Sequence, residues 1–168
     1  ASDVHGIGID YGNCKKISKD NYDKLVKSGC RPSYMDVLIV KDGATTGRVG
    51  LKNDDKDCVL LSSVAMLTPK TSVDSYYLMW LLSSEVLQFQ SKKSMAGSAM
   101  PRITLTKLND FIVIDCPLEE QTKIVNCINE VIPIYDSLIA EKESLINDLE
   151  TYKKSLIYEV VTGKRRVV

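Results

Sequence analysis

Apolar residues recur with a helical period over the last third of the chain. Alternating steps of four and three residues separate the members of a series that we call the seam: Ile124, Ile128, Val131, Tyr135, Leu138, Leu145, Leu149, Tyr152 and Leu156. Lys142 fills the one slot of the series that is not apolar, and a second row at Ile132, Ile139 and Ile146 widens the stripe. A mean spacing of about 3.5 residues is typical of a helix that packs lengthwise on another helix. We therefore expect a long helix whose seam is covered by a partner helix. A terminal helix folded back on its own domain is the alternative.

Residues typical of helix ends bound this stripe. Pro117 suits the first position of a helix, where its missing N–H is no loss, and Glu119 complements the positive end of the helix dipole. Gly163 can adopt the left-handed conformation that ends a helix. Pro133 removes one backbone hydrogen bond, so we expect a kink near this residue or a division into a short and a long helix.

The first 116 residues indicate a mixed domain. Short apolar or β-branched runs predict strands at residues 37–40, 48–51, 58–61, 64–67 and 111–114. A glycine-rich connection at residues 41–47 joins the first two strands. Residues 73–90 predict a helix with a wide apolar face. The expected fold class is α+β, with a strand-rich domain at residues 1–116, a helix at residues 117–163 and a basic tail at residues 164–168.

Composition and charge narrow the possible partners. The chain is 44% hydrophobic and 26% charged, which is typical of soluble globular proteins, and no apolar run approaches the roughly 20 residues that span a bilayer. Its formal net charge is zero, whereas a strong stand-alone nucleic-acid binder is normally basic. If the chain binds DNA, we therefore expect a partner to supply much of the electrostatic attraction.

Residues that could carry catalysis or bind a metal are sparse. His5 is the one histidine, and its isolated position near the terminus removes the usual base for a Ser or Cys nucleophile. The five cysteines are scattered and never spaced as CxxC, which argues for free thiols in a reducing cytoplasm rather than a zinc site. Asp54, Asp55 and Asp57 suit a solvated acidic loop better than a metal site. We expect no enzymatic activity, no metal and no cofactor. A cysteine-dependent enzyme is the weakest alternative.

Four segments together form a pattern that is more specific than any one of them. They are residues 36–39 with Gly43 and Gly47, residues 96–108, residues 116–125 and residues 149–164. In order and spacing they resemble the motifs of the specificity (S) subunits of type I restriction–modification systems. The strongest is CPLEEQTKIV at residues 116–125, which is similar to the start of that family's conserved helix. The first segment departs from the family, which usually has Gly in the place of Met35.

The resemblance implies a target recognition domain followed by one spacer helix. S subunits of this family carry two such halves, whose helices pack antiparallel, and they choose the DNA sequence without doing chemistry themselves. They dock the modification subunits, which bring the methyltransferase activity, and the restriction subunit can join them. One half is present here, as a natural half-length subunit or a fragment, so the resemblance implies a homodimer that binds double-stranded DNA. A coiled-coil dimeric scaffold that binds no DNA is the alternative.

Polar and basic residues in the first domain are the candidate DNA contacts. Sequence recognition needs donors that reach base edges, and arginine to guanine is the commonest specific contact. The candidates are Lys41, Thr45, Thr46, Arg48 and Lys52 around the glycine-rich connection, and Lys92, Lys93, Ser94, Ser98 and Arg102 farther along the chain. Gly43 and Gly47 are expected to permit the turn rather than to contact DNA. We expect loss of Arg48 or Arg102 to lower DNA affinity.

Overall fold

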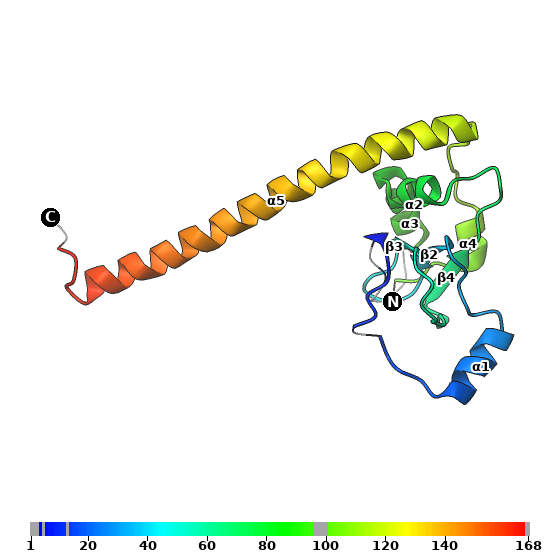
Figure 1. The fold of residues 1–168 in the computed structure, drawn as a ribbon, viewed down its shortest axis with the longest axis horizontal. Coiled ribbons are helices and arrows are strands. Elements are labelled where there is room, and N and C mark those ends of the chain that lie inside the picture. Colours follow the sequence, from blue (N-terminus) through cyan, green and yellow to red (C-terminus); the bar gives the residue numbers. More distant parts are fainter. Residues whose placement is uncertain (1–3, 5, 13, 96–100, 167–168) are drawn as a thin grey trace. The chain divides into compact units, whose positions relative to one another are not determined.

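A computed structural model describes residues 4, 6–12, 14–95 and 101–166 of the chain. The chain divides into two compact units, Ala1–Val125 and Asn126–Val168. Within the described ranges, the first unit holds a small sheet, four helices and the start of a fifth helix, and the second unit holds the rest of that helix (Figure 1). The α+β fold class, a mixed strand-containing domain followed by a long C-terminal helix, is therefore confirmed.

Four short strands form the sheet in the described part of the first unit. They are β1 (Gly6–Ile7), β2 (Val37–Val40), β3 (Val49–Leu51) and β4 (Val64–Leu67), in the spatial order β1-β3-β2-β4. β2 pairs antiparallel with β3 and β4, and β1 pairs parallel with β3. The predicted strands 37–40, 48–51 and 64–67 are confirmed to within one residue. Every residue of β2 is buried, which explains why its sequence is an uninterrupted apolar run.

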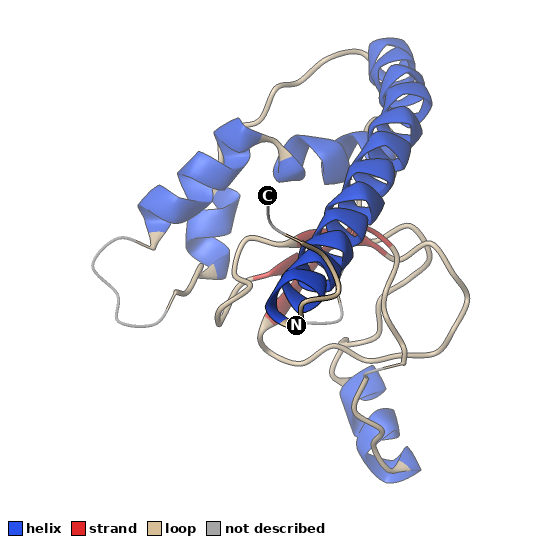
Figure 2. Ribbon diagram, turned by 90° about the vertical axis from the view of Figure 1, so that its left-hand side faces the viewer, coloured by secondary structure: helices blue, strands red, loops and turns tan. Residues whose placement is uncertain are grey.

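Four of the described helices belong to the first unit, and the fifth continues into the second unit. They are α1 (Lys19–Lys27), α2 (Ser75–Ser83), α3 (Glu85–Ser94), α4 (Leu105–Asn109) and α5 (Leu118–Val161). The single helix predicted over residues 73–90 is two helices. Ser84 is extended (φ −63°, ψ 152°) and is both the C-cap of α2 and the N-cap of α3. The Ser84 side chain makes no capping hydrogen bond, and its backbone N–H donates to Leu81 O at 3.1 Å. Figure 2 shows that much of the first unit between these elements is loop.

Alternate residues of β2 point into two separate cores. Val37 and Ile39 belong to the main core, which they share with apolar side chains of α2 and α3. Leu38 and Val40 lie on the opposite face, where they pack with Val4. Because both faces are covered, a slip of one residue would still place apolar side chains in both cores, so the apolar pattern of β2 does not by itself fix its register.

Two of the predicted strands are wrong. Residues 111–114 belong to no strand and pair with no neighbouring strand. The side chain of Gln90 takes the place of one, since its Nε2 donates to Ile112 O and its Oε1 accepts from Ile112 N, both at 2.9 Å. Residues 58–61 make one long-range backbone bond, from Leu60 N to Cys30 O at 2.8 Å. In both places the apolar run forms no ladder with a neighbouring strand.

The first turns of α5 are fixed to the first unit through Gln121. This side chain is 1% exposed, its Oε1 accepts from Asp74 N at 2.8 Å, and its Nε2 donates to Ser72 O and Cys116 O at 3.1 and 2.8 Å. Asp74 in turn caps α2, because its carboxylate accepts from Tyr77 N at 2.9 Å. The glutamine of the CPLEEQ segment therefore joins the start of α5 to the start of α2.

In the second unit, α5 runs through Pro133 without an interruption. The expected division into two helices does not occur, and a kink at Pro133 stays a prediction. The helix ends at Val161, and Gly163 follows with φ +74°, the left-handed conformation expected of it. None of the described helices is both long and apolar enough to cross a membrane.

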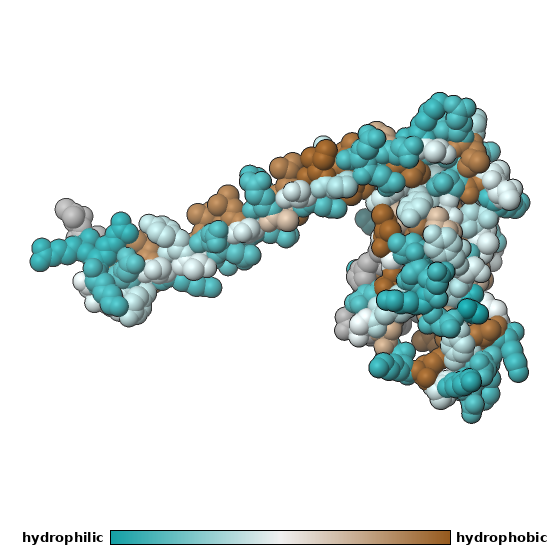
Figure 3. All heavy atoms as spheres, in the orientation of Figure 1, coloured by the Kyte–Doolittle hydropathy of each residue, from teal (hydrophilic) through white to brown (hydrophobic). Residues whose placement is uncertain are grey.

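Most of the seam is exposed. Six of its members are between 40% and 62% exposed: Val131, Tyr135, Leu138, Leu145, Leu149 and Tyr152. Ile139 and Ile146 of the second row are 55% and 56% exposed. Apolar side chains are visible in stretches along α5 in Figure 3. Within the described part of Asn126–Val168, α5 is the one regular element, so its own unit offers nothing to cover these side chains.

Candidate nucleic-acid interface

The connection between β2 and β3 is a closed turn that depends on glycine. Val40 N donates to Arg48 O at 2.8 Å, and Gly47 N donates to Val40 O at 2.7 Å. Gly43 and Gly47 have φ angles of +99° and +92°, which residues with a side chain rarely adopt. A Cβ at Gly47 would also lie 3.0 Å from Oε1 of Gln88. The interpretation of both glycines as turn formers fits this geometry.

A second segment runs antiparallel to the turn. Gly43 N donates to Pro101 O at 3.2 Å, and Ile103 N donates to Lys41 O at 2.8 Å. Ile103 is 1% exposed and anchors this segment in the main core. The hydroxyl of Thr46 donates to Gly43 O at 2.6 Å and lies 3.2 Å from Pro101 O. Residues 41–48 and 101–103 therefore form one surface.

Helix α3 lies against the same turn. Nε2 of Gln88 donates to Gly47 O at 2.8 Å and to Leu82 O at 2.9 Å, so one side chain joins the turn to the end of α2. At the other end of α3, Lys107 Nζ donates to Ser94 O. We call the surface made by residues 41–48, 88–94 and 101–107 the turn cluster.

The turn cluster carries an excess of exposed positive charge. Arg48, Lys92 and Lys93 are exposed, and the side chain of Arg102 is 66% exposed. The carboxylate of Asp42 lies between Arg102 and Lys41, with Oδ1 3.1 Å from Arg102 Nε and Oδ2 3.7 Å from Lys41 Nζ. Basic side chains that surround a turn stabilised by backbone hydrogen bonds are suited to contact phosphates and base edges.

The sequence candidates are distributed unevenly over this surface. Lys41, Thr45, Thr46, Arg48, Lys92, Lys93, Ser94 and Arg102 all lie in the turn cluster. Ser98 lies outside the described residues. The hydroxyl of Ser94 donates to Ser91 O at 2.8 Å, as that of Thr46 donates within the turn, so both hydroxyls stabilise the local backbone.

The prediction that Lys52 contacts DNA is not supported. Lys52 follows the far end of β3 and is 2% exposed. Its Nζ donates to Asp54 O at 2.5 Å and forms an ion pair with the carboxylate of the same residue. A buried ammonium group paired with a carboxylate cannot reach a duplex without breaking that pair. The sequence does indicate this burial, because Lys52 directly follows the apolar run of β3, a buried strand.

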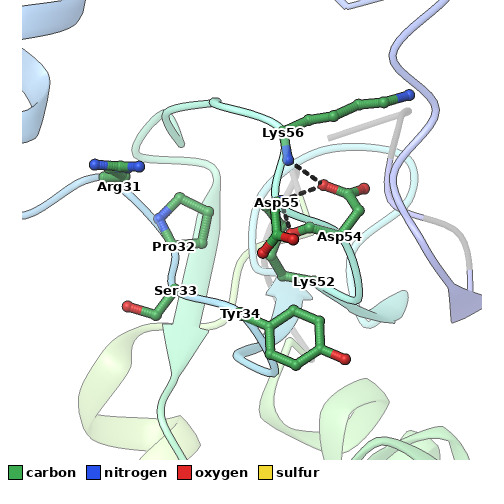
Figure 4. Close-up of a pocket in the computed structure, with 8 residues that line it drawn as sticks. All are labelled: Arg31, Pro32, Ser33, Tyr34, Lys52, Asp54, Asp55 and Lys56. Atoms are coloured by element: carbon green, nitrogen blue, oxygen red, sulfur yellow. Dashed lines mark hydrogen bonds and ion pairs between the residues drawn. The ribbon is translucent and has the colours of Figure 1, made fainter.

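An open cavity of about 270 Å³ lies at this far end (Figure 4). Its lining is Arg31, Pro32, Ser33, Tyr34, Lys52, Asp54, Asp55 and Lys56. The hydroxyl of Tyr11 donates to Asp54 Oδ1 at 2.9 Å, and burial together with this bond raises the pKa of Tyr11. Burial opposes ionisation of Asp54, but hydrogen bonds from Lys52, Tyr11 and Lys56 outweigh it and lower the pKa of the carboxyl.

These contacts hold the loop after β3 in place, and nothing in the cavity indicates a ligand. Burial raises the pKa of the neighbouring Cys58 thiol, which disfavours the nucleophilic thiolate. Among the described residues, no group of three His, Cys, Asp or Glu side chains is placed to hold a metal ion. The cavity is therefore a poorer candidate site than the turn cluster.

Sequence reasoning missed two residues of the turn cluster that position others, Asp42 and Gln88. Each contacts a segment that is distant in the sequence, so spacing along the chain could not reveal its partner. Lys107, which also lies in the cluster, belongs to α4, a helix that the sequence did not predict.

The chain matches a known protein family. The family described as the type I restriction modification DNA specificity domain matches residues 6–150, which is well over half of the chain. The match includes the sheet, the turn cluster and most of α5. No curated protein sequence matches the chain. The sequence motifs and the family match agree: the chain belongs to the type I restriction modification DNA specificity domain family, whose members recognise DNA sequence in type I restriction–modification systems.

Proposed function

We propose that this chain is the non-catalytic DNA-recognition subunit of a type I restriction–modification complex and that it works as a dimer. The turn cluster contacts one DNA half-site, and α5 pairs with α5 of a second copy. The exposed seam of α5 is the observation that supports dimerisation most strongly. A monomer that kept six large apolar side chains of one stripe in water would expose a patch of the kind that marks an interaction surface.

The distribution of charge along α5 favours an antiparallel pair. Residues 118–150 carry eight acidic and two basic residues, whereas residues 151–166 carry one acidic and five basic residues. A parallel pair would place the acidic segments side by side, and an antiparallel pair places each acidic segment toward the basic end of its partner. Like charges on neighbouring helices destabilise a pair and opposite charges set its orientation.

Antiparallel pairing would make α5 a spacer. Residues 134–161 of α5 span roughly 42 Å at about 1.5 Å per residue. That length corresponds to on the order of 13 bp of B-DNA. Two identical subunits related by a two-fold axis would prefer a target whose two halves form an inverted repeat.

The modification subunits have a candidate docking surface on the same helix. Ile139 and Ile146 form a row beside the seam, and both are more than half exposed. A two-stranded coiled coil covers a narrow stripe, so a wider apolar face leaves area for a further helix. The modification subunits supply the methyltransferase activity and much of the positive charge that a neutral recognition subunit lacks. The restriction subunit joins through them.

The proposal places the protein in the cytoplasm, with the DNA that it recognises. All five cysteines are free thiols, as is usual in a reducing compartment. The protein needs no cofactor of its own, because catalysis resides in its partners.

Binding of the chain to duplex DNA, with and without its modification subunits, tests the proposal. We expect weak, salt-sensitive binding by the chain alone and tight, sequence-selective binding by the assembled complex. A chain that dimerises but gives no DNA binding in either form would be a coiled-coil scaffold, and the proposal would be wrong.

A further inference from the structure

Asp42 and Arg102 are paired through both their backbones and their side chains. They form an isolated antiparallel bridge. Backbone hydrogen bonds lie on both sides of this bridge, from Gly43 N to Pro101 O and from Ile103 N to Lys41 O. Residues opposite each other in such a bridge have side chains on the same face. Arg102 Nε lies 3.1 Å from Asp42 Oδ1 as a result.

The position of the ion pair on the guanidinium group decides what Arg102 can still bind. Asp42 contacts Nε, which lies at the base of the group, so the two terminal amino groups lie beyond the contact. The side chain of Arg102 is 66% exposed, whereas that of Asp42 is 28% exposed, so the carboxylate supports the arginine from the protein side. Two terminal donors in one plane match the O6 and N7 acceptors of guanine in the major groove.

A carboxylate near DNA needs neutralisation, and the turn cluster provides it. Oδ2 of Asp42 lies 3.7 Å from Lys41 Nζ, and the Lys41 side chain is 14% exposed. Asp42 is thus flanked by two cations, and the group of three carries a net positive charge. This arrangement removes the repulsion that an unpaired carboxylate would have for phosphate.

A second Arg–Asp pair in the same unit lacks these features. Arg31 Nη2 lies 2.7 Å from Asp57 Oδ1 at the edge of the far cavity, and both side chains are more than half exposed, at 54% and 65%. Neither residue belongs to a strand or bridge in the described chain. Such an exposed ion pair contributes little to the free energy of folding. It offers a matched control of the same chemistry.

We infer that Asp42 and Arg102 form a base-recognition pair, in which Arg102 contacts a guanine and Asp42 is the positioning residue that orients it. This inference rests on the proposed function, in which the turn cluster faces the duplex. It goes further by naming the base and by giving a role to a carboxylate that does not contact DNA.

The test begins with a pool of randomised duplexes, from which the wild-type complex of this chain with its modification subunits selects its target. Affinity is then measured for the selected duplex and for duplexes changed at each base pair in turn. We expect R102A to weaken binding to the selected duplex by about tenfold or more and to remove discrimination at one G·C pair. D42N, which keeps the shape of the side chain, should reduce discrimination at that same pair by a smaller factor.

Three variants make the result specific. R102K should fail to restore discrimination, because an ammonium group cannot make two parallel contacts. R31A and D57N should leave the whole base-pair profile unchanged. Thermal unfolding of each variant identifies any loss that comes from misfolding, and D42N then separates orientation from folding.

Three other outcomes would contradict the role of Arg102, the role of Asp42 or the proposed function. A uniform loss by R102A on every duplex would make Arg102 a phosphate contact, and the inference would be wrong while the proposed function stood. An R102A profile that changes at one G·C pair with an unchanged D42N profile would remove Asp42 from the pair. A wild-type complex that binds selected and random duplexes equally would refute the proposed function itself.

Discussion

The two units of this chain differ in the burial of their large apolar residues. In the first unit, Leu38 and Ile39 are 0% and 1% exposed, and their strand is covered on both faces. In the second unit, Leu138 and Leu149 are 47% and 58% exposed. Burial of such a side chain stabilises a fold by about 1.5–3 kcal/mol. The first unit gains that energy by itself, whereas the second can gain it only from a surface outside its own residues.

Removal of a core side chain should have the largest effect on folding. Ile39→Ala is expected to lower the free energy of unfolding of the first unit by about 3–4 kcal/mol, because the side chain is fully buried between the sheet and the helices. Trp80 is the one tryptophan and lies in this unit, so its fluorescence during urea denaturation reports the change. Leu145→Ala, in the exposed seam, is the comparison and should leave this transition unchanged.

A charge in the seam should affect self-association rather than the folding of the first unit. Leu145→Lys is expected to weaken self-association by about a hundredfold, since a buried ammonium group without a partner is costly at a helix interface. Sedimentation velocity over a range of concentrations measures the shift to monomer. Ser144→Lys adds the same charge one position away, outside the seam, and should leave the dimer intact. Equal effects from the two variants would mean that the seam is not the interface.

The exposed arginines should affect DNA binding and not folding. Arg48→Ala and Arg102→Ala are each expected to lower the affinity of the assembled complex for DNA by about tenfold, which is about 1.4 kcal/mol. Arg31→Ala, at the far cavity, removes the same charge from the same unit and is the control. Unchanged affinity in Arg48→Ala and Arg102→Ala would exclude the turn cluster as the DNA-binding surface.

The polar contacts at the far cavity should give the smallest effect, with a defined pH dependence. The pKa of Asp54 is lowered in the folded chain by its hydrogen bonds, although burial opposes this. A lowered pKa means that the stabilisation is complete above the carboxyl's ordinary pKa of 3.8 and is lost as the pH falls through the folded value. Asp54→Asn should therefore cost about 1 kcal/mol at pH 7, after allowance for partial exposure. Urea unfolding at pH 7 and pH 3 measures the cost, and an equal cost at both would contradict this assignment.

The same contrast explains how far the sequence could predict the fold. β2 and β4 were predictable because continuous apolar runs bounded by turn residues have few other uses in a small domain. The helix from Leu118 to Val161 was predictable because its period persists over many turns. α1 was missed because its apolar stripe is short, limited to Tyr22, Leu25 and Val26, and none of these side chains is fully buried. Residues 111–114 have the composition of a strand, but the side chains of Gln90 and Tyr77 bond Ile112 and Ile114 where a neighbouring strand would.

The candidate site was predictable in outline and not in detail. Glycines and basic residues close together in sequence, such as Gly47 and Arg48, identified the turn. The pairing of Asp42 with Arg102 depends on a bridge between distant segments, which no local pattern encodes. Lys52 was misassigned for the related reason that its burial depends on a loop that folds back over it.

Sedimentation equilibrium of the full chain, without DNA or other subunits, tests most directly whether α5 pairs with a second copy. At micromolar concentration we expect a mass of twice the 18.7 kDa of the chain. Resonance energy transfer between labels on residues 126 and 156 should be stronger across the two copies than transfer between two labels on residue 126, as antiparallel helices require. A mass of 18.7 kDa throughout the range would contradict the pairing of α5 with a second copy of itself.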